Sequence, residues 1–86
     1  MKELNEKLNT WARTKAIDYT DTEIGIAHCF KHLMPKLQYW KIVTFGKRYE
    51  AMIARDSMGS YYSDIAETPT LAICRAIEKL IDVEAK

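Results

Sequence analysis

His28 and His32 lie four residues apart, a spacing that places two imidazoles one helical turn apart and forms half of a zinc site. A zinc site needs at least one further protein ligand, and neither a glutamate motif nor a cysteine pair is spaced to supply it. Cys29 and Cys74 are far apart and lie within helical patterns, which is typical of buried, reduced thiols. We therefore predict no metal site and interpret the two histidines as exposed surface residues.

Five residues of the second half of the chain are candidates for binding a ligand. Lys41 and Arg48 are expected on one face of a hairpin, two pairs apart, where they could meet phosphate oxygens. Tyr61 and Tyr62 adjoin serines, and a tyrosine ring can stack on a base. Arg75, on the last predicted helix, is a further candidate for a phosphate contact. Together these residues predict a site for a small anionic ligand such as a nucleotide.

Each candidate also has a purely structural interpretation. The two hairpin cations can keep a sheet face hydrated and pair with Glu50, and the tyrosines can pack on the sheet. Arg75 can pair with Glu78 three residues later, a surface contact worth about a few tenths of a kcal/mol. The residue types alone do not decide between these interpretations.

The sequence contains no arrangement typical of a catalytic centre. We find no nucleophile–base pair, no glycine-rich phosphate loop and no paired carboxylates. Asp64 and Glu67 are the nearest acidic pair to the candidate site, but acids are favoured before a helix N-terminus for electrostatic reasons alone. We therefore predict a non-enzymatic protein without a cofactor.

The net charge of the 86 residues is only +1, but the charge is unevenly distributed. Residues 31–55 carry +5, whereas the segments before and after carry −1 and −3. A nearly neutral chain with a basic middle does not suit general nucleic-acid binding, and it can suit a small anion. No apolar run approaches the roughly 18 residues of a membrane helix.

The candidate cations lie on a predicted β-hairpin over residues 38–55. Side chains there alternate and are rich in β-branched and aromatic types, and Gly46-Lys47 suits a two-residue type II′ turn. This turn sets the register. One face carries the pairs Thr44–Tyr49, Ile42–Ala51 and Trp40–Ile53, which we expect to meet the helices; the other carries Phe45–Arg48, Val43–Glu50 and Lys41–Met52.

Two helices are predicted before the hairpin. Residues 2–15 form a short amphipathic helix, and a second runs from about 21 to 34, where Pro35 stops it. Thr20 and Glu23 have the spacing of a capping box at its start. Its expected buried arc contains Ile26, Ala27, Cys29, Phe30, Leu33 and Met34.

A third strand at 61–65 and a helix over 69–82 follow the hairpin, the helix capped by Thr68. We expect both tryptophans, Trp11 and Trp40, in the core. The result is one α+β domain over residues 1–86 in the order α-α-β-β-(β)-α, with helices packed on a small antiparallel sheet.

Three stretches carry a resemblance to a known family: residues 19–23, the strand 40–43, and AETPTLAICRAI over residues 66–77. The last resembles the "TPxLAICRA" helix of the phage ABA-sandwich domain family, small proteins of bacteriophages and prophages. The likeness extends over roughly residues 4–82, although the insert at 56–64 is longer than the family's pattern. It implies an α/β/α sandwich, with helix–sheet–helix layering, and a location in the cytoplasm of a bacterial host. It implies no reaction and no catalytic residues.

Two functions are compatible with these features. The first is a phage-encoded, non-catalytic binder that sequesters a nucleotide-derived signal of host defence. The second is a protein- or nucleic-acid-interaction module acting during infection or lysogeny. We also expect a homodimer, because three short helices leave a face or an edge of so small a sheet uncovered.

Overall fold

The computed structural model describes residues 1–56 and 59–85, which form three α-helices, two short helical turns of other types and a three-stranded antiparallel sheet. In chain order the elements are α1 (Lys2–Ala12), α2 (Gly25–His28), the π-helical turn η1 (Cys29–Leu33), the 3-10 turn η2 (Met34–Lys36), β1 (Tyr39–Phe45), β2 (Arg48–Ala54), β3 (Tyr62–Ala66) and α3 (Pro69–Glu84). The α+β class and the order of elements are as predicted.

The sheet has the order β1-β2-β3, and the hairpin has the predicted register from Phe45↔Arg48 to Trp40↔Ile53. Gly46 has a φ of 64°, whereas Lys47 has no positive φ, the combination that a type II′ turn requires. The predicted third strand is also present, shifted by one residue so that it begins at Tyr62.

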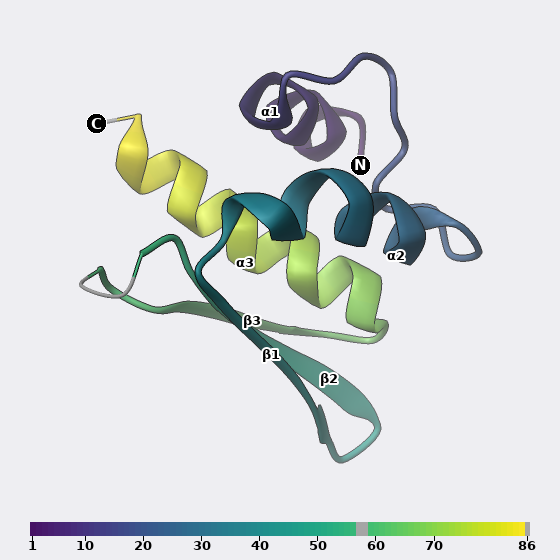
Figure 1. Ribbon diagram of the computed structural model, residues 1–86. Helices are drawn as coiled ribbons and strands as arrows, with labels where there is room; N and C mark the ends of the chain where they lie inside the picture. The colour runs from purple at the N-terminus through teal and green to yellow at the C-terminus, as the bar shows by residue number, and fades with distance from the viewer. Residues whose placement is uncertain (57–58, 86) are drawn as a thin grey trace.

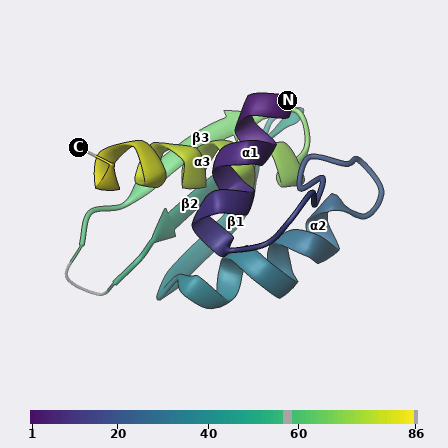
Figure 2. The same ribbon diagram turned by 90° about the horizontal axis from the view of Figure 1, so that it is seen from above.

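The helices form layers over one face of the sheet (Figure 1). α3 packs on β2 and β3, and α1 lies across α3, as the view from above shows (Figure 2). On β2 the side chains that face α3, Ala51 and Ile53, are fully buried, while Glu50 and Met52, which alternate with them, stay half-exposed. This arrangement differs from the helix–sheet–helix layering that the resemblance implies, because no described helix covers the outer face of the sheet.

The core lies between the sheet and the helices. Its largest fully buried side chains come from every layer: Leu8, Tyr19, Leu33, Ile53, Ile73 and Ile77. α3 begins as predicted, with the Thr68 hydroxyl accepting a hydrogen bond from the Leu71 amide at 3.1 Å and with Pro69 at the first helical position. Because α3 presents its apolar stripe to β2 and β3 on one side and to α1 on the other, it is the central element of the fold.

The predicted second helix is broken, and its start differs from the prediction. The Asp21 carboxylate, not the Thr20 hydroxyl, accepts from the amides of Glu23 and Ile24, at 2.8 and 2.9 Å. Thr20 instead donates its hydroxyl hydrogen to Asp18 at 2.8 Å. The capping-box prediction was therefore wrong, because a competing carboxylate occupies the Thr20 hydroxyl and Asp21 is an equally good cap.

The wider π-helical turn of η1 changes which side chains of this segment face inward. Cys29 and Leu33 are buried as predicted, but Phe30 is 41% exposed and packs edge-on against Trp40, with ring centroids 5.0 Å apart. Trp40 is itself 42% exposed. Its assignment to the core was wrong, because β1 is an edge strand and α3 packs mainly on β2 and β3.

Candidate functional site

Arg48 and Arg75 lie beside the same shallow cleft, which has a volume of about 360 Å³. The pairing of Tyr49 with Ala66 brings the start of β2 next to the end of β3, from which the chain turns into α3. Arg75 lies in the second turn of α3, four residues after Leu71 and therefore on the same helix face. The remaining lining residues are Ile65, Ala66 and Glu67.

The two guanidinium groups of this cleft have no polar partner among the described residues. Both side chains are exposed, and among the described residues neither makes an ion pair or a hydrogen bond. Some cations elsewhere in the chain are paired: Arg55 binds Glu84 at 2.8 Å, and Lys79 lies 3.7 Å from Asp64. With Glu67 as the acidic residue of the lining, the cleft keeps an excess of positive charge over an apolar floor.

The other three predicted ligand-binding residues lie elsewhere. Lys41 is exposed on the outer face of β1, opposite Met52. Tyr62 pairs with Ile53, five residues along β2 from Arg48, which is roughly 17 Å at the rise of a β-strand. Tyr61 is 59% exposed and packs edge-on against Tyr39, with ring centroids 5.3 Å apart. The structure therefore brings Arg48 and Arg75 together and separates them from both tyrosines.

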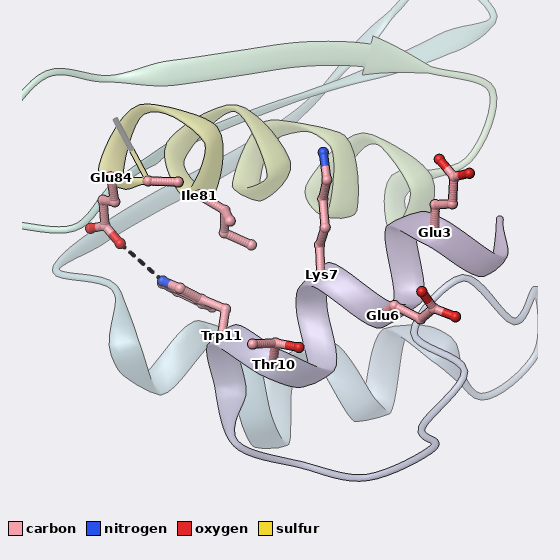
Figure 3. A pocket seen from close by; sticks show the side chains of 8 residues that line it. Glu3, Glu6, Lys7, Thr10, Trp11, Ile81 and Glu84 are labelled. Carbon is pink, nitrogen blue, oxygen red and sulfur yellow. Dashed lines mark hydrogen bonds between the residues drawn. The ribbon is translucent and has the colours of Figure 1, made fainter.

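A larger cleft, of about 600 Å³, lies between α1 and the end of α3, and sequence analysis missed it (Figure 3). The Trp11 ring and Ile81 form its apolar part, and Glu3, Glu6 and Glu84 make it acidic. A local pattern could reveal only part of this site, because it joins residues among the first eleven to residues among the last five of the described chain. The i, i+4 placement of Lys7 and Trp11 on one face of α1 was the available signal.

Two charged groups of this larger cleft, Lys7 and Glu84, form ion pairs with residues outside its lining. Lys7 binds Glu78 at 3.0 Å and Asp82 at 3.1 Å, and these hydrogen bonds raise the pKa of its ammonium group. The Trp11 indole donates to Glu84 at 3.1 Å, and Arg55 lies 5.5 Å from the ring centroid. Because Lys7, the one cation in its lining, is already paired and three glutamates line it as well, this cleft does not suit an anion.

The two histidines are half-buried, not exposed as predicted. Their rings lie 6.4 and 6.3 Å from the Tyr19 ring, edge-on to it, and stack on each other at 6.5 Å. The surface interpretation was wrong because Tyr19, in the connector before α2, folds under the helix that carries them. Among residues 1–56 and 59–85, no group of three or more potential ligands is placed to hold a metal ion.

The two cysteines are buried and reduced as predicted, with their sulfurs 3.8 Å apart. Both thiols contact the Tyr19 carbonyl oxygen, at 3.8 and 3.6 Å. The hydrogen bond with Cys29 and burial raise the pKa of Cys74 far above its ordinary value, so its thiol stays protonated. Burial also raises the pKa of Tyr19. These groups therefore act as core residues.

No protein-family model, curated protein or solved structure matches this chain. The resemblance to the phage ABA-sandwich family therefore stays a prediction. No helix in the part of the chain that the structure describes has the length and apolar character needed to cross a membrane.

Proposed function

We propose that this protein is a non-catalytic binding protein for a small phosphate-bearing ligand, which it holds in the cleft between Arg48 and Arg75. The supporting observation is that two guanidinium groups without ion-pair partners among the described residues lie on either side of one cleft. Following the resemblance, the proposed ligand is a nucleotide-derived signal of host defence, sequestered in the cytoplasm of a bacterial host. Sequestration requires binding alone, and no reaction.

The chemistry of the cleft suits such a ligand. A guanidinium can donate two parallel hydrogen bonds to phosphate oxygens, and it stays charged at all physiological pH values. Leu71 and Ile65 supply apolar surface against which a base or ribose can lie. The Glu67 carboxylate repels anionic groups of a ligand, and this repulsion favours one orientation of the ligand in the cleft. In this proposal the tyrosines take no part, unlike in the expectation from sequence.

Titration calorimetry with a panel of cyclic dinucleotides and ADP-ribose derivatives tests the proposal. We expect one class to bind, and expect Arg48→Ala and Arg75→Ala each to weaken its binding by at least about tenfold. Lys47→Ala is the matched control, because Lys47 is an exposed cation of the same hairpin outside the cleft. No heat with any compound, or equal losses in all three variants, would overturn the proposal.

We further propose that the protein acts as a homodimer. The support is the outer face of the sheet and its β1 edge, neither of which any described element covers. Light scattering at micromolar concentration should give twice the chain mass of 10.0 kDa. A mass of one chain at that concentration would contradict this proposal without affecting the ligand site.

The alternative function, an interaction module, is favoured by the aromatic side chains that β1 exposes. The cations of residues 31–55 do not form one continuous stripe, because Lys36 and Arg55 lie over the Trp11 ring, at 5.0 and 5.5 Å from its centroid, whereas Arg48 lines the cleft. A gel-shift assay with random-sequence DNA and RNA distinguishes the two. Salt-sensitive binding that Arg48→Ala and Lys47→Ala weaken equally would favour the alternative.

A further inference from the structure

β1 is an edge strand that exposes large aromatic side chains on both of its faces. Tyr39 and Phe45, on the outer face, are 38% and 58% exposed, and Trp40, on the helix side, is 42% exposed. The strand has seven residues, contains no proline and carries one charge, that of Lys41. Natural edge strands are normally short, charged, bulged or covered, because an open edge pairs with other strands.

The backbone groups along this edge have known directions. In a hairpin closed by a two-residue loop, the flanking pair Phe45–Arg48 is hydrogen-bonded, and successive pairs then alternate. Trp40, Ile42 and Thr44 therefore direct their N–H and C=O groups away from β2, toward the free edge. Among the described residues, no side chain satisfies these six groups.

The opposite edge is partly closed by one side chain of α3 and one of β3. By the same alternation, Ser63 and Ile65 of β3 direct their backbone groups away from β2. The Lys79 ammonium donates to the Ser63 carbonyl at 2.7 Å, and the Asp64 carboxylate accepts from the Ile65 amide at 2.7 Å. Two of the four outward backbone groups of β3 are thus already bonded, whereas none of the six on β1 has a partner among the described residues, so β1 is the more open edge of this sheet.

We propose that β1 pairs antiparallel with β1 of a second copy about a two-fold axis at Ile42, which joins two sheets into one of six strands. This contact rests on the homodimer proposed above and names its interface. In this register Ile42 lies opposite itself, Trp40 opposite Thr44, and Tyr39 opposite Phe45 of the second copy. In each of these pairs the two side chains lie on the same face of the joined sheet, because the paired positions differ by an even number of residues.

The sequence of β1 is complementary to itself in this register. The pairs Trp40–Thr44, Ile42–Ile42 and Thr44–Trp40 exchange all of the outward backbone groups. Tyr39 and Phe45 form aromatic cross-strand pairs on the outer face. Lys41 lies opposite Val43, whereas a register centred on Lys41 would place two ammonium groups opposite each other. This complementarity is why we assign the edge to a second copy of the chain.

The helix side of the junction adds apolar contact. Phe30, which is 41% exposed, covers part of Trp40 on the face that the helices occupy. Because a two-fold axis through Ile42 is perpendicular to the sheet, both copies carry their helices on the same side of the joined sheet. The two Phe30–Trp40 pairs then flank the axis and exclude water from the new backbone hydrogen bonds.

Removing one outward donor tests the interface. Thr44→Pro deletes the outward Thr44 amide but no bond to β2, and proline is tolerated at such an edge position. We expect the dimer dissociation constant to rise about thirtyfold, because each dimer loses two hydrogen bonds. Thr44→Ala is the control and should stay dimeric. A proline variant that dimerises as tightly as the wild type, with an unchanged circular dichroism spectrum, would overturn the β1 interface and leave the homodimer standing.

Cross-linking tests the register without relying on the folding of a proline variant. Lys41 and Val43 of two copies form a non-hydrogen-bonded pair, whose Cα atoms lie about 4.5 Å apart, within disulfide range. We expect a mixture of Lys41→Cys and Val43→Cys chains to form disulfide-linked dimers under mild oxidation, and each variant alone to form at least about fivefold fewer. Cys29 and Cys74 are fully buried and give no background. Equal cross-linking in the mixture and in the separate variants would overturn the register, whereas a monomeric wild type would overturn the homodimer itself.

Discussion

β3 and β1 flank the same central strand, yet the β3 edge is partly closed and the β1 edge is open. β3 is followed after two residues by α3, which folds back over it and supplies Lys79 to its outward carbonyl. β1 is preceded by the broken helical segment α2–η1–η2, of which Phe30 reaches Trp40. The difference teaches that chain connectivity, more than strand composition, decides which edge of a small sheet is protected.

The largest effect should come from removing apolar volume under α3. Ile53→Ala empties a fully buried position on β2 and should lower the free energy of unfolding by about 3–4 kcal/mol, because the cavity cannot collapse between packed layers. Ile42→Ala, the half-buried neighbour on β1, should cost about 1 kcal/mol. Urea denaturation measures both. Equal losses would show that β1 is as well covered as β2.

The second-largest effect should come from removing the side chain that covers part of the β3 edge. Lys79→Met removes the ammonium that binds Ser63 and Asp64 while keeping most of the side chain's apolar length, and should cost about 1 kcal/mol of stability. The exposed Ser63 carbonyl should then permit association beyond the dimer, which sedimentation velocity detects as larger species. Lys31→Met, at another exposed lysine, is the control and should do neither.

A smaller effect is expected where β1 meets the turn before β3. Tyr61→Ala deletes the edge-on contact with Tyr39 and should lower stability by about 0.5 kcal/mol, because both rings are largely hydrated. The same substitution should leave ligand binding unchanged, because Tyr61 lies at the far end of the sheet from the Arg48–Arg75 cleft. If calorimetry shows that Tyr61→Ala weakens ligand binding as much as Arg48→Ala does, Tyr61 would have to be part of the binding site.

The smallest effect is a pH dependence confined to the helix layers. Hydrogen bonds from Thr20 and then Asn5 hold the pKa of the Asp18 carboxyl below its ordinary value of 3.8. The ionised group therefore stabilises the folded state above that pH, and this contribution is lost as the pH falls through the lowered pKa. Asp18 is exposed, so the effect is strongly screened.

Hydrogen exchange at a series of acidic pH values locates this dependence. The Thr20 amide, which donates to Asp18, should lose protection first, and the amides shared by β1 and β2 should not respond over the same interval. Asp18→Asn should abolish the response. Simultaneous loss of protection in the hairpin would show that the connector and the sheet open together.

Local sequence patterns were enough to predict the hairpin register and the start of α3. The register follows from one glycine with a positive φ and from strict alternation, and the start of α3 follows from Thr68 and Pro69. The start of the helical segment over residues 20–36 was harder to predict from sequence. Asp18 and Asp21 are alternative hydrogen-bond partners to those expected for Thr20 and for the amide of Glu23. Gly25 illustrates the tertiary constraint there, since a Cβ atom at this position would lie 2.5 Å from the Tyr19 carbonyl oxygen.

The sequence by itself therefore determined the elements, their order and the pairing of the hairpin, because each depends on residues close together in the chain. It also identified Arg48 and Arg75 as candidate ligand contacts, but it left open whether they pair with Glu50 and Glu78, and it did not identify them as neighbours. Only the tertiary structure placed them at one cleft, because the β2–β3 pairing and the return of α3 bring residues 27 positions apart side by side. It also placed the described helices on one face of the sheet, because α3 buries its apolar stripe against β2 and β3.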